Sequence, residues 1–176
     1  MISEDKIKEK DGTSIEVKKI NNIMYLLFKG DAVKDIPNDV AYPKVMLGEC
    51  ETCGKGAAKI KEIYKDFTYD KVLIGGLGLG LIAEYLKTEK NCSVIDVVEN
   101  NQELIDYVDY LESPINIIKG DALTYTPSKK YDLILIDLWW NIDDITQEIQ
   151  DNIKNNYNSH LESGGKIVLP ILEKEL

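Results

Sequence analysis

The feature that most constrains the fold is an apolar run, residues 72–74, that enters a turn with glycine at positions 76, 78 and 80. The amphipathic run 81–87 follows at once, so the segment predicts a strand, a tight turn and a helix. Glycine lets a backbone turn sharply and approach a ligand closely, and the amides of a helix N-terminus favour a carboxylate or phosphate. We interpret Gly76, Gly78 and Gly80 as part of a nucleotide-type site, although a structural turn would explain the cluster taken alone.

The spacing of these glycines separates the classes of nucleotide site. A dinucleotide site needs the pattern G-x-G-x-x-G, but counting from Gly76 places Leu81 at the third glycine. A P-loop needs lysine and then serine or threonine after its last glycine, whereas Leu81 and Ile82 follow Gly80. Both phosphate-binding patterns are therefore excluded.

Three further apolar runs each lead to an acidic residue. These residues are Glu99 after 93–98, Asp121 after 115–118 and Asp137 after 133–136. In open α/β sheets, ligands bind at the carboxyl ends of the strands, and an acid about 20 residues beyond the glycines can accept both ribose hydroxyls. Glu99 occupies that place, although it could instead cap the next helix, as Asn100 and Asn101 could. The order of the acids along the chain favours a ligand site.

The remaining sequence predicts one α/β domain with a small N-terminal appendage. Residues 14–20 and 23–29 predict a β-hairpin, and from residue 71 strands and helices alternate, as in a mostly parallel sheet covered on both faces. We divide the chain into an N-terminal β-hairpin and loop, 1–56, and a Rossmann-like nucleoside-binding domain, 57–176. The expected helices are 57–67, 81–87, 102–111 and 143–161, and the expected fifth strand is 166–169.

Composition limits the partners. The 21 basic residues are all lysine and face 31 acidic ones, giving a net charge of -10 that disfavours nucleic acid. The charged N-terminus and strand-sized apolar runs predict a cytoplasmic protein without a membrane partner. Cys50 and Cys53 have the spacing of half a zinc site, but only Cys92 and His160 could complete it. We therefore expect free thiols and no metal.

The glycine turn with Glu99 and Asp121 resembles the first motifs of class I S-adenosylmethionine (SAM)-dependent methyltransferases. The resemblance narrows toward spermidine synthases, which are aminopropyltransferases of this fold, because Gly30 and Tyr42 keep that family's spacing. It implies SAM or decarboxylated SAM as the cofactor. It also implies a catalytic or acceptor-orienting role for Asp137 and substrate contacts for Tyr42, Trp139 and Trp140, although one of the two tryptophans is expected in the core. The implied cofactor-binding residues are Gly76, Gly78, Gly80, Glu99, Asn100, Asp121 and Ala122.

The sequence departs from spermidine synthases on the amine side of the site. Pro43-Lys44 replaces the family's His-Glu pair, and Asp137 alone remains of the acidic motif, where Trp140 stands in place of the second aspartate. A positioned general base contributes about 10² to 10⁴ in rate, so we expect poor spermidine synthesis. The antiparallel hairpin that closes such sheets is also expected to be missing. The last residues, the N-terminal hairpin or a second copy of the chain would then cover the fifth strand, and we expect a homo-oligomer.

Three classes of function remain. The first, which we favour, is a transferase that moves a methyl or aminopropyl group from the cofactor to a small-molecule acceptor. The second is an enzyme that breaks SAM down without an acceptor, as a lyase or hydrolase. The third is a catalytically silent protein that binds the adenosyl ligand.

Overall fold

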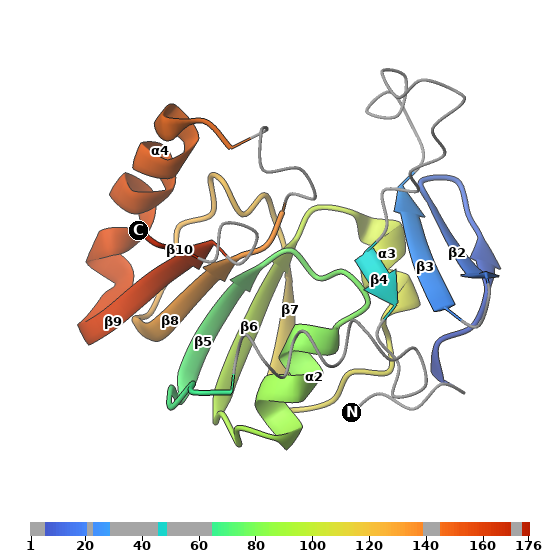
Figure 1. Ribbon diagram of the computed structural model, residues 1–176, viewed down its shortest axis with the longest axis horizontal. Coiled ribbons are helices and arrows are strands. Elements are labelled where there is room, and N and C mark those ends of the chain that lie inside the picture. Colours follow the sequence, from blue (N-terminus) through green and yellow to red (C-terminus); the bar gives the residue numbers. More distant parts are fainter. Residues whose placement is uncertain (1–5, 21–22, 29–45, 49–64, 139–144, 170–173) are drawn as a thin grey trace.

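The computed structural model describes residues 6–20, 23–28, 46–48, 65–138, 145–169 and 174–176, which form two sheets (Figure 1). The first sheet is antiparallel, in the order β1-β2-β3-β4, and its strands are Lys10–Asp11, Ile15–Ile20, Ile23–Phe28 and Met46–Gly48. The second sheet has the order β10-β9-β8-β5-β6-β7. In chain order, β5 to β10 are Lys71–Gly75, Val94–Glu99, Ile115–Lys119, Tyr131–Ile136, Leu161–Leu169 and Lys174–Glu175.

The topology confirms the predicted α/β fold. Strands β2 and β3 form the predicted hairpin, with Ile20 opposite Ile23. Strands β5 to β9 run parallel, and β5 lies between β6 and β8. The chain therefore leaves β5 toward one side of the sheet and later returns to its other side, which makes the carboxyl end of β5 the topological switch point where such sheets bind ligands.

Alternate residues of the central strands bury opposite faces of the sheet. Val72 and Ile74 pack on one face with helices α2 (Leu81–Thr88) and α3 (Gln102–Tyr107). Leu73 packs on the other face with helix α4 (Gln147–Tyr157), which Figure 1 shows beside β8 and β9. The N-terminal sheet adds the buried residues Ile15, Val17 and Leu26 to the first cluster. The hairpin and the parallel sheet thus share a hydrophobic core, and the domain boundary near residue 56 stays a prediction.

The connection from α4 to β9 differs from the expected one. Helix α4 begins after its cap, Thr146, and is followed by a 3-10 turn, η4 (Asn158–His160), so that β9 starts at Leu161 instead of 166. The two glycines expected before the strand lie inside it. Gly164 has a φ of +81°, and the pairing of β9 with β8 shifts register between Tyr131 and Leu133. Glycine accommodates such an irregularity within a strand, which explains the longer strand.

Two predicted helices also have different limits. Helix α3 ends at Tyr107 instead of 111, because the following residues pack against the glycine turn: the Tyr110 hydroxyl donates to the Leu79 carbonyl at 2.9 Å. Most of the predicted helix 57–67 lies outside the described residues. Its last three residues, 65–67, are not helical.

The edge of the sheet is covered by the last residues of the sequence, one of the three covers that the sequence left open. Strand β10 pairs antiparallel with β9, with Lys174 opposite Leu169, and the Leu176 N–H donates to the Ile167 carbonyl at 2.9 Å. In place of a full closing hairpin, the described residues contain this two-residue strand. Its pairing reaches only the carboxyl end of β9.

Self-association stays a prediction. Its reason is now the part of the β9 edge that β10 does not cover. Among the described residues, β10 pairs with Val168 and Leu169 of the nine-residue strand β9. Because an open strand edge favours pairing with another chain, we expect a dimer or larger oligomer at micromolar concentration. Sedimentation velocity tests this, and a monomer over the micromolar range would contradict it.

Candidate functional site

The glycine turn follows β5 at the centre of the sheet. Gly76, Gly78 and Gly80 all have left-handed backbone conformations, with φ of +100°, +52° and +76°. The Gly76 N–H donates to the Val98 carbonyl at 2.8 Å, which ties the turn to the end of β6. A Cβ at position 76 would lie 2.4 Å from the Asp137 carbonyl oxygen, so the turn also lies directly against the end of β8. The turn is thus packed between two neighbouring strand ends.

Apolar side chains of the turn pack into the hydrophobic core and hold the turn in place. Leu77 and Leu79 alternate with the glycines and are buried in the core shared with α2 and the N-terminal sheet. The Leu111 side chain packs against Gly80: a Cβ added at Gly80 would lie 2.7 Å from its nearest atom. Among the described residues no side chain caps the N-terminus of α2, so its first-turn amides are not taken by a cap.

Glu99, the predicted ribose anchor, is the last residue of β6, and its side chain is 7% exposed. Its carboxylate joins two backbone amides: Oε2 accepts from the Leu77 N–H at 3.0 Å, and Oε1 accepts from the Asn101 N–H at 2.7 Å. Each carboxylate oxygen can accept two hydrogen bonds, so with respect to the described residues each keeps one acceptor position. Glu99 is therefore both fixed and able to accept a pair of hydroxyl groups.

The helix cap proves to be a different residue. The Asn101 side-chain oxygen accepts from the Leu104 N–H at 3.0 Å and thereby caps α3. Asn100 is exposed, and its carbonyl accepts from the Lys119 amino group. Asn101, and not Glu99, therefore caps α3, and the Glu99 carboxylate bonds instead to the Leu77 and Asn101 amides.

Asp121 and Ala122 follow β7 in the expected place. The Gly120 N–H donates to the Glu99 carbonyl at 2.9 Å, which brings the ends of β6 and β7 together. Asp121 is exposed, and its carboxylate accepts from the Leu123 N–H at 2.9 Å. Ala122 is buried, and its Cβ lies 2.8 Å from the position that a Cβ at Gly75 would take. Ala122 thus packs against the glycine turn, with Asp121 beside it at the surface.

Asp137, the predicted catalytic residue, follows β8. Its N–H donates to the Gly75 carbonyl at 2.8 Å, so its backbone is held against the start of the glycine turn. The residue is half-buried, and burial raises the pKa of its carboxyl group to about 6. A carboxyl group with such a pKa can bind or release a proton near neutral pH.

The predicted substrate residues cannot be placed. Tyr42, Trp139 and Trp140 lie outside the described residues, as do Cys50 and Cys53. Cys92 is buried, its thiol donates to the Tyr69 carbonyl at 3.0 Å, and burial raises its pKa to about 11. Within the described ranges, no three His, Cys, Asp or Glu residues gather as a metal site would require, and no helix is long and apolar enough to cross a membrane.

Sequence reasoning missed several residues that build the site. Leu77 contributes a backbone N–H to Glu99, and Leu111 covers Gly80; Asn101 was named only as a possible cap, and its backbone N–H to Glu99 was not foreseen. A backbone donor leaves no mark in the sequence. Asn101 does carry a signal, since asparagine before a helical run favours a cap.

The strand order, the glycine turn at the switch point and the acid at the end of β6 define a Rossmann-like fold of the class I methyltransferase type. Solved structures that share this fold include proteins named as methyltransferases. StiE O-MT has a TM-score of 0.55 and 16% identity, over 68% of this chain and 44% of its own. The glycopeptide N-methyltransferase MtfA complexed with SAM has a TM-score of 0.52 and 17% identity, over 64% of this chain and 48% of its own.

A SAM-dependent methyltransferase from Clostridium acetobutylicum is similar at a TM-score of 0.51 and 18% identity, over 62% of this chain and 48% of its own. This chain therefore spans about half the length of the structures that it resembles. No protein-family model and no curated protein sequence matches it. At these identities the likeness shows the fold alone.

Proposed function

We propose that the chain binds SAM at the carboxyl edge of its parallel sheet and transfers the methyl group to a small-molecule acceptor. The observation that carries the proposal is Glu99, a buried carboxylate held by the Leu77 and Asn101 amides with an acceptor position left on each oxygen. A ribose diol is the ligand group that uses two adjacent acceptors of this kind. The fold neighbours, which include MtfA complexed with SAM, support the choice of cofactor.

The neighbouring residues have matching roles in this proposal. The left-handed turn at Gly76 would let the backbone approach the ligand, and Asp121 would accept from the adenine amino group beside the backbone of Ala122. Asp137, at the end of β8, would face the ammonium group of the ligand or the acceptor. When bound, SAM would supply an electrophilic methyl group, while these residues bind and orient the reactants. The net charge of -10 favours a neutral or cationic acceptor.

Calorimetric titration with SAM, S-adenosylhomocysteine and decarboxylated SAM tests the binding step. We expect the first two to bind, and no heat from any adenosyl ligand would contradict the proposal.

Incubation with SAM alone, followed by product analysis, separates a transferase from an enzyme that breaks SAM down. Decarboxylated SAM with putrescine tests aminopropyl transfer. We expect little product, because Trp140 stands where spermidine synthases have the second aspartate of their acidic motif.

The raised pKa of Asp137 predicts a pH dependence of binding. An ionised Asp137 attracts the ammonium group of the ligand, whereas a protonated one does not. We therefore expect the dissociation constant for SAM to rise as pH falls through about 6, the pKa of Asp137. Titrations between pH 5 and 8 check this, and the dependence should be absent in Asp137→Asn.

The unliganded protein provides a control of opposite sign. Because folding raises the pKa of Asp137 from 3.8 to about 6, its contribution to stability is present below about pH 4 and is lost as pH rises through about 6. Asp137→Asn should therefore unfold at a higher temperature than the parent at pH 7 and converge with it near pH 4. Identical melting temperatures of the parent and Asp137→Asn at pH 7 would contradict the raised pKa of Asp137 in the folded protein.

A further inference from the structure

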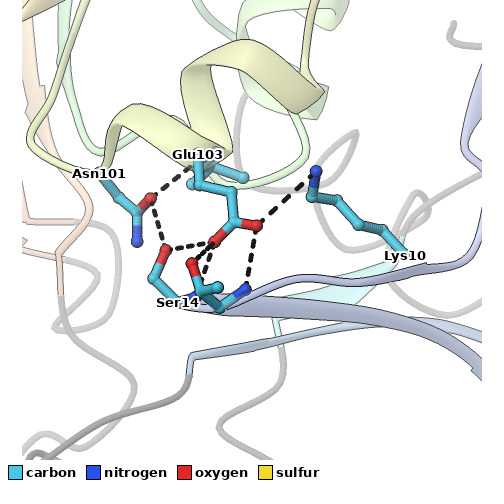
Figure 2. Close-up of polar contacts among 6 residues, drawn as sticks. Lys10, Ser14, Asn101 and Glu103 are labelled. Atoms are coloured by element: carbon cyan, nitrogen blue, oxygen red, sulfur yellow. Dashed lines mark hydrogen bonds and ion pairs between the residues drawn. The ribbon is translucent and has the colours of Figure 1, made fainter.

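A polar cluster joins the N-terminal hairpin to the first turn of α3 (Figure 2). At its centre the Glu103 carboxylate accepts from the backbone amides of Thr13 and Ser14, at 3.1 and 2.6 Å. It also accepts from their hydroxyl groups, at 3.1 and 2.7 Å, and lies 3.7 Å from the Lys10 ammonium group. These hydrogen bonds hold the pKa of Glu103 down at about 2, so the carboxylate is ionised at any physiological pH.

The same cluster reaches the cap of α3. The Ser14 hydroxyl has one proton and makes a three-centre hydrogen bond: the shorter arm, 2.7 Å, reaches the ionised Glu103 carboxylate, and the longer arm, 3.1 Å, reaches the Asn101 side-chain oxygen. The Asn101 oxygen thus accepts from the Leu104 N–H and also lies against the Ser14 hydroxyl, a contact that Figure 2 shows. The Leu104 N–H is the stronger donor to this oxygen, and the longer arm of the Ser14 bond adds a contact from the hairpin.

Asn101 connects this cluster to the candidate ligand site. Its backbone N–H donates to Glu99 Oε1 at 2.7 Å, while Leu77 in the glycine turn donates to Glu99 Oε2 at 3.0 Å. The hydrogen bonds therefore run without interruption from Ser14 through Asn101 and Glu99 to Leu77. The N-terminal hairpin ends this path on one side, and the glycine turn ends it on the other.

Attachment of the hairpin does not by itself require this path. Ile15, Val17 and Leu26 are each at most 1% exposed and pack in the same core as Leu104. A separate hydrogen bond from the Tyr107 hydroxyl to the Lys8 carbonyl, at 2.7 Å, also joins the N-terminal segment to α3. What distinguishes the Ser14 contact is that it ends on the residue that holds Glu99.

We propose that Ser14 is a positioning residue for the adenosyl site: by holding Asn101, it fixes the Glu99 carboxylate in the orientation that leaves its two remaining acceptor positions to a ribose. The inference rests on the proposed function, because it assigns the N-terminal hairpin a role in ligand binding. Glu99 touches the ligand in this scheme, whereas Ser14 acts only through Asn101.

Titration with S-adenosylhomocysteine tests the role of Ser14 in binding. Loss of the hydroxyl, with its contacts to Glu103 and Asn101, predicts a dissociation constant about three- to tenfold higher for Ser14→Ala. Ser14→Thr, which keeps the hydroxyl, should restore the parent value. Tyr107→Phe is the matched control, since it removes a hydrogen bond between the same two segments that does not lead to Glu99. Its dissociation constant should stay within about twofold of the parent, and equal losses in Ser14→Ala and Tyr107→Phe would overturn the proposal.

Combination with Glu99→Ala tests whether Ser14 acts through the carboxylate. In that background Ser14→Ala should have no further effect on binding, because the group that it positions is gone. Full additivity of the two losses would contradict a path through Glu99.

Amide hydrogen exchange in the unliganded protein tests the path without any ligand. Ser14→Ala should speed exchange at the Leu77 and Asn101 amides, the two donors to Glu99, while Tyr107→Phe leaves both rates unchanged. Failure of the parent to bind S-adenosylhomocysteine would count against the proposed function, and the exchange rates would still decide the positioning role. Unchanged exchange at both amides in Ser14→Ala would overturn it.

Discussion

Gly76→Ala is expected to abolish binding of S-adenosylhomocysteine, with a loss of at least about 100-fold, and to lower stability. The position combines two obstacles to a side chain. Its φ of +100° is a left-handed conformation, which costs an L-residue about 1–2 kcal/mol. The new Cβ would also lie 2.4 Å from the Asp137 carbonyl oxygen.

The clash at Gly76 is hard to relieve because the facing atom belongs to the backbone. Asp137 is held by the hydrogen bond of its N–H to the Gly75 carbonyl, and the preceding residue, Ile136, pairs with Gly75 in the sheet. We therefore expect the glycine turn to move instead, which displaces Leu77 from Glu99. Calorimetry and thermal unfolding measure the two effects.

Gly164→Ala is the matched control for backbone strain. Gly164 has a comparable φ of +81°, but nothing lies within 4 Å of an added Cβ, and it lies in β9 near the start of β8, away from the ligand edge. We expect a stability loss of about 1–2 kcal/mol with unchanged binding. Normal binding by Gly76→Ala would contradict a role of the glycine turn in ligand binding.

Glu99→Ala should weaken binding of S-adenosylhomocysteine at least tenfold while the fold is retained. Removal of the carboxylate leaves the ribose hydroxyls without acceptors and the Leu77 and Asn101 amides without partners. An unsatisfied buried polar group costs about 1–3 kcal/mol, or about 5- to 150-fold in affinity, and two hydroxyl groups lose their acceptor here. Calorimetric titration measures the change, and circular dichroism confirms that the variant is folded.

Asp96→Asn is the matched control, because Asp96 is the other buried acid of β6 and is 2% exposed. Burial raises its pKa, but hydrogen bonds from Lys129, Tyr131 and Asn116 outweigh this effect and lower the pKa overall. Side chains alternate between the two faces of a strand, so Asp96 and Glu99, three residues apart in β6, point to opposite faces of the sheet. The contacts of Asp96 therefore stabilise the fold away from the candidate site. We expect Asp96→Asn to lose stability and to keep the parent dissociation constant, and parent-like affinity in folded Glu99→Ala would contradict the ribose assignment.

The parts of the molecule that the sequence predicted are local. An apolar run followed by closely spaced glycines specifies the strand and turn at Gly76, because few residues other than glycine adopt positive φ without cost. The positions of Glu99, Asp121 and Asp137 at strand ends were predicted for a related reason. The carboxyl ends of parallel strands meet at one edge, so the positions of the acids along the chain predict that they gather in space.

Element ends were less predictable because distant contacts set them. The pattern of apolar residues continues the helix to Leu111, but α3 ends at Tyr107 and the next residues cover the glycine turn. Likewise β9 starts at Leu161 because pairing with Tyr131 extends it through Gly164 and Gly165. Local propensity is a weak preference that such packing overrides.

The sequence by itself determined the class of fold, the glycine turn and the acids at the strand ends, because each depends on neighbouring residues and on the periodicity of strands and helices. Only the tertiary structure decided how Glu99 is held. Ser14 and Asn101 are 87 positions apart, and Leu77 and Glu99 are 22 apart. Contacts at such separations arise when the core packs the hairpin and α3 together, and a backbone amide that donates across them has no side chain to mark it in the sequence.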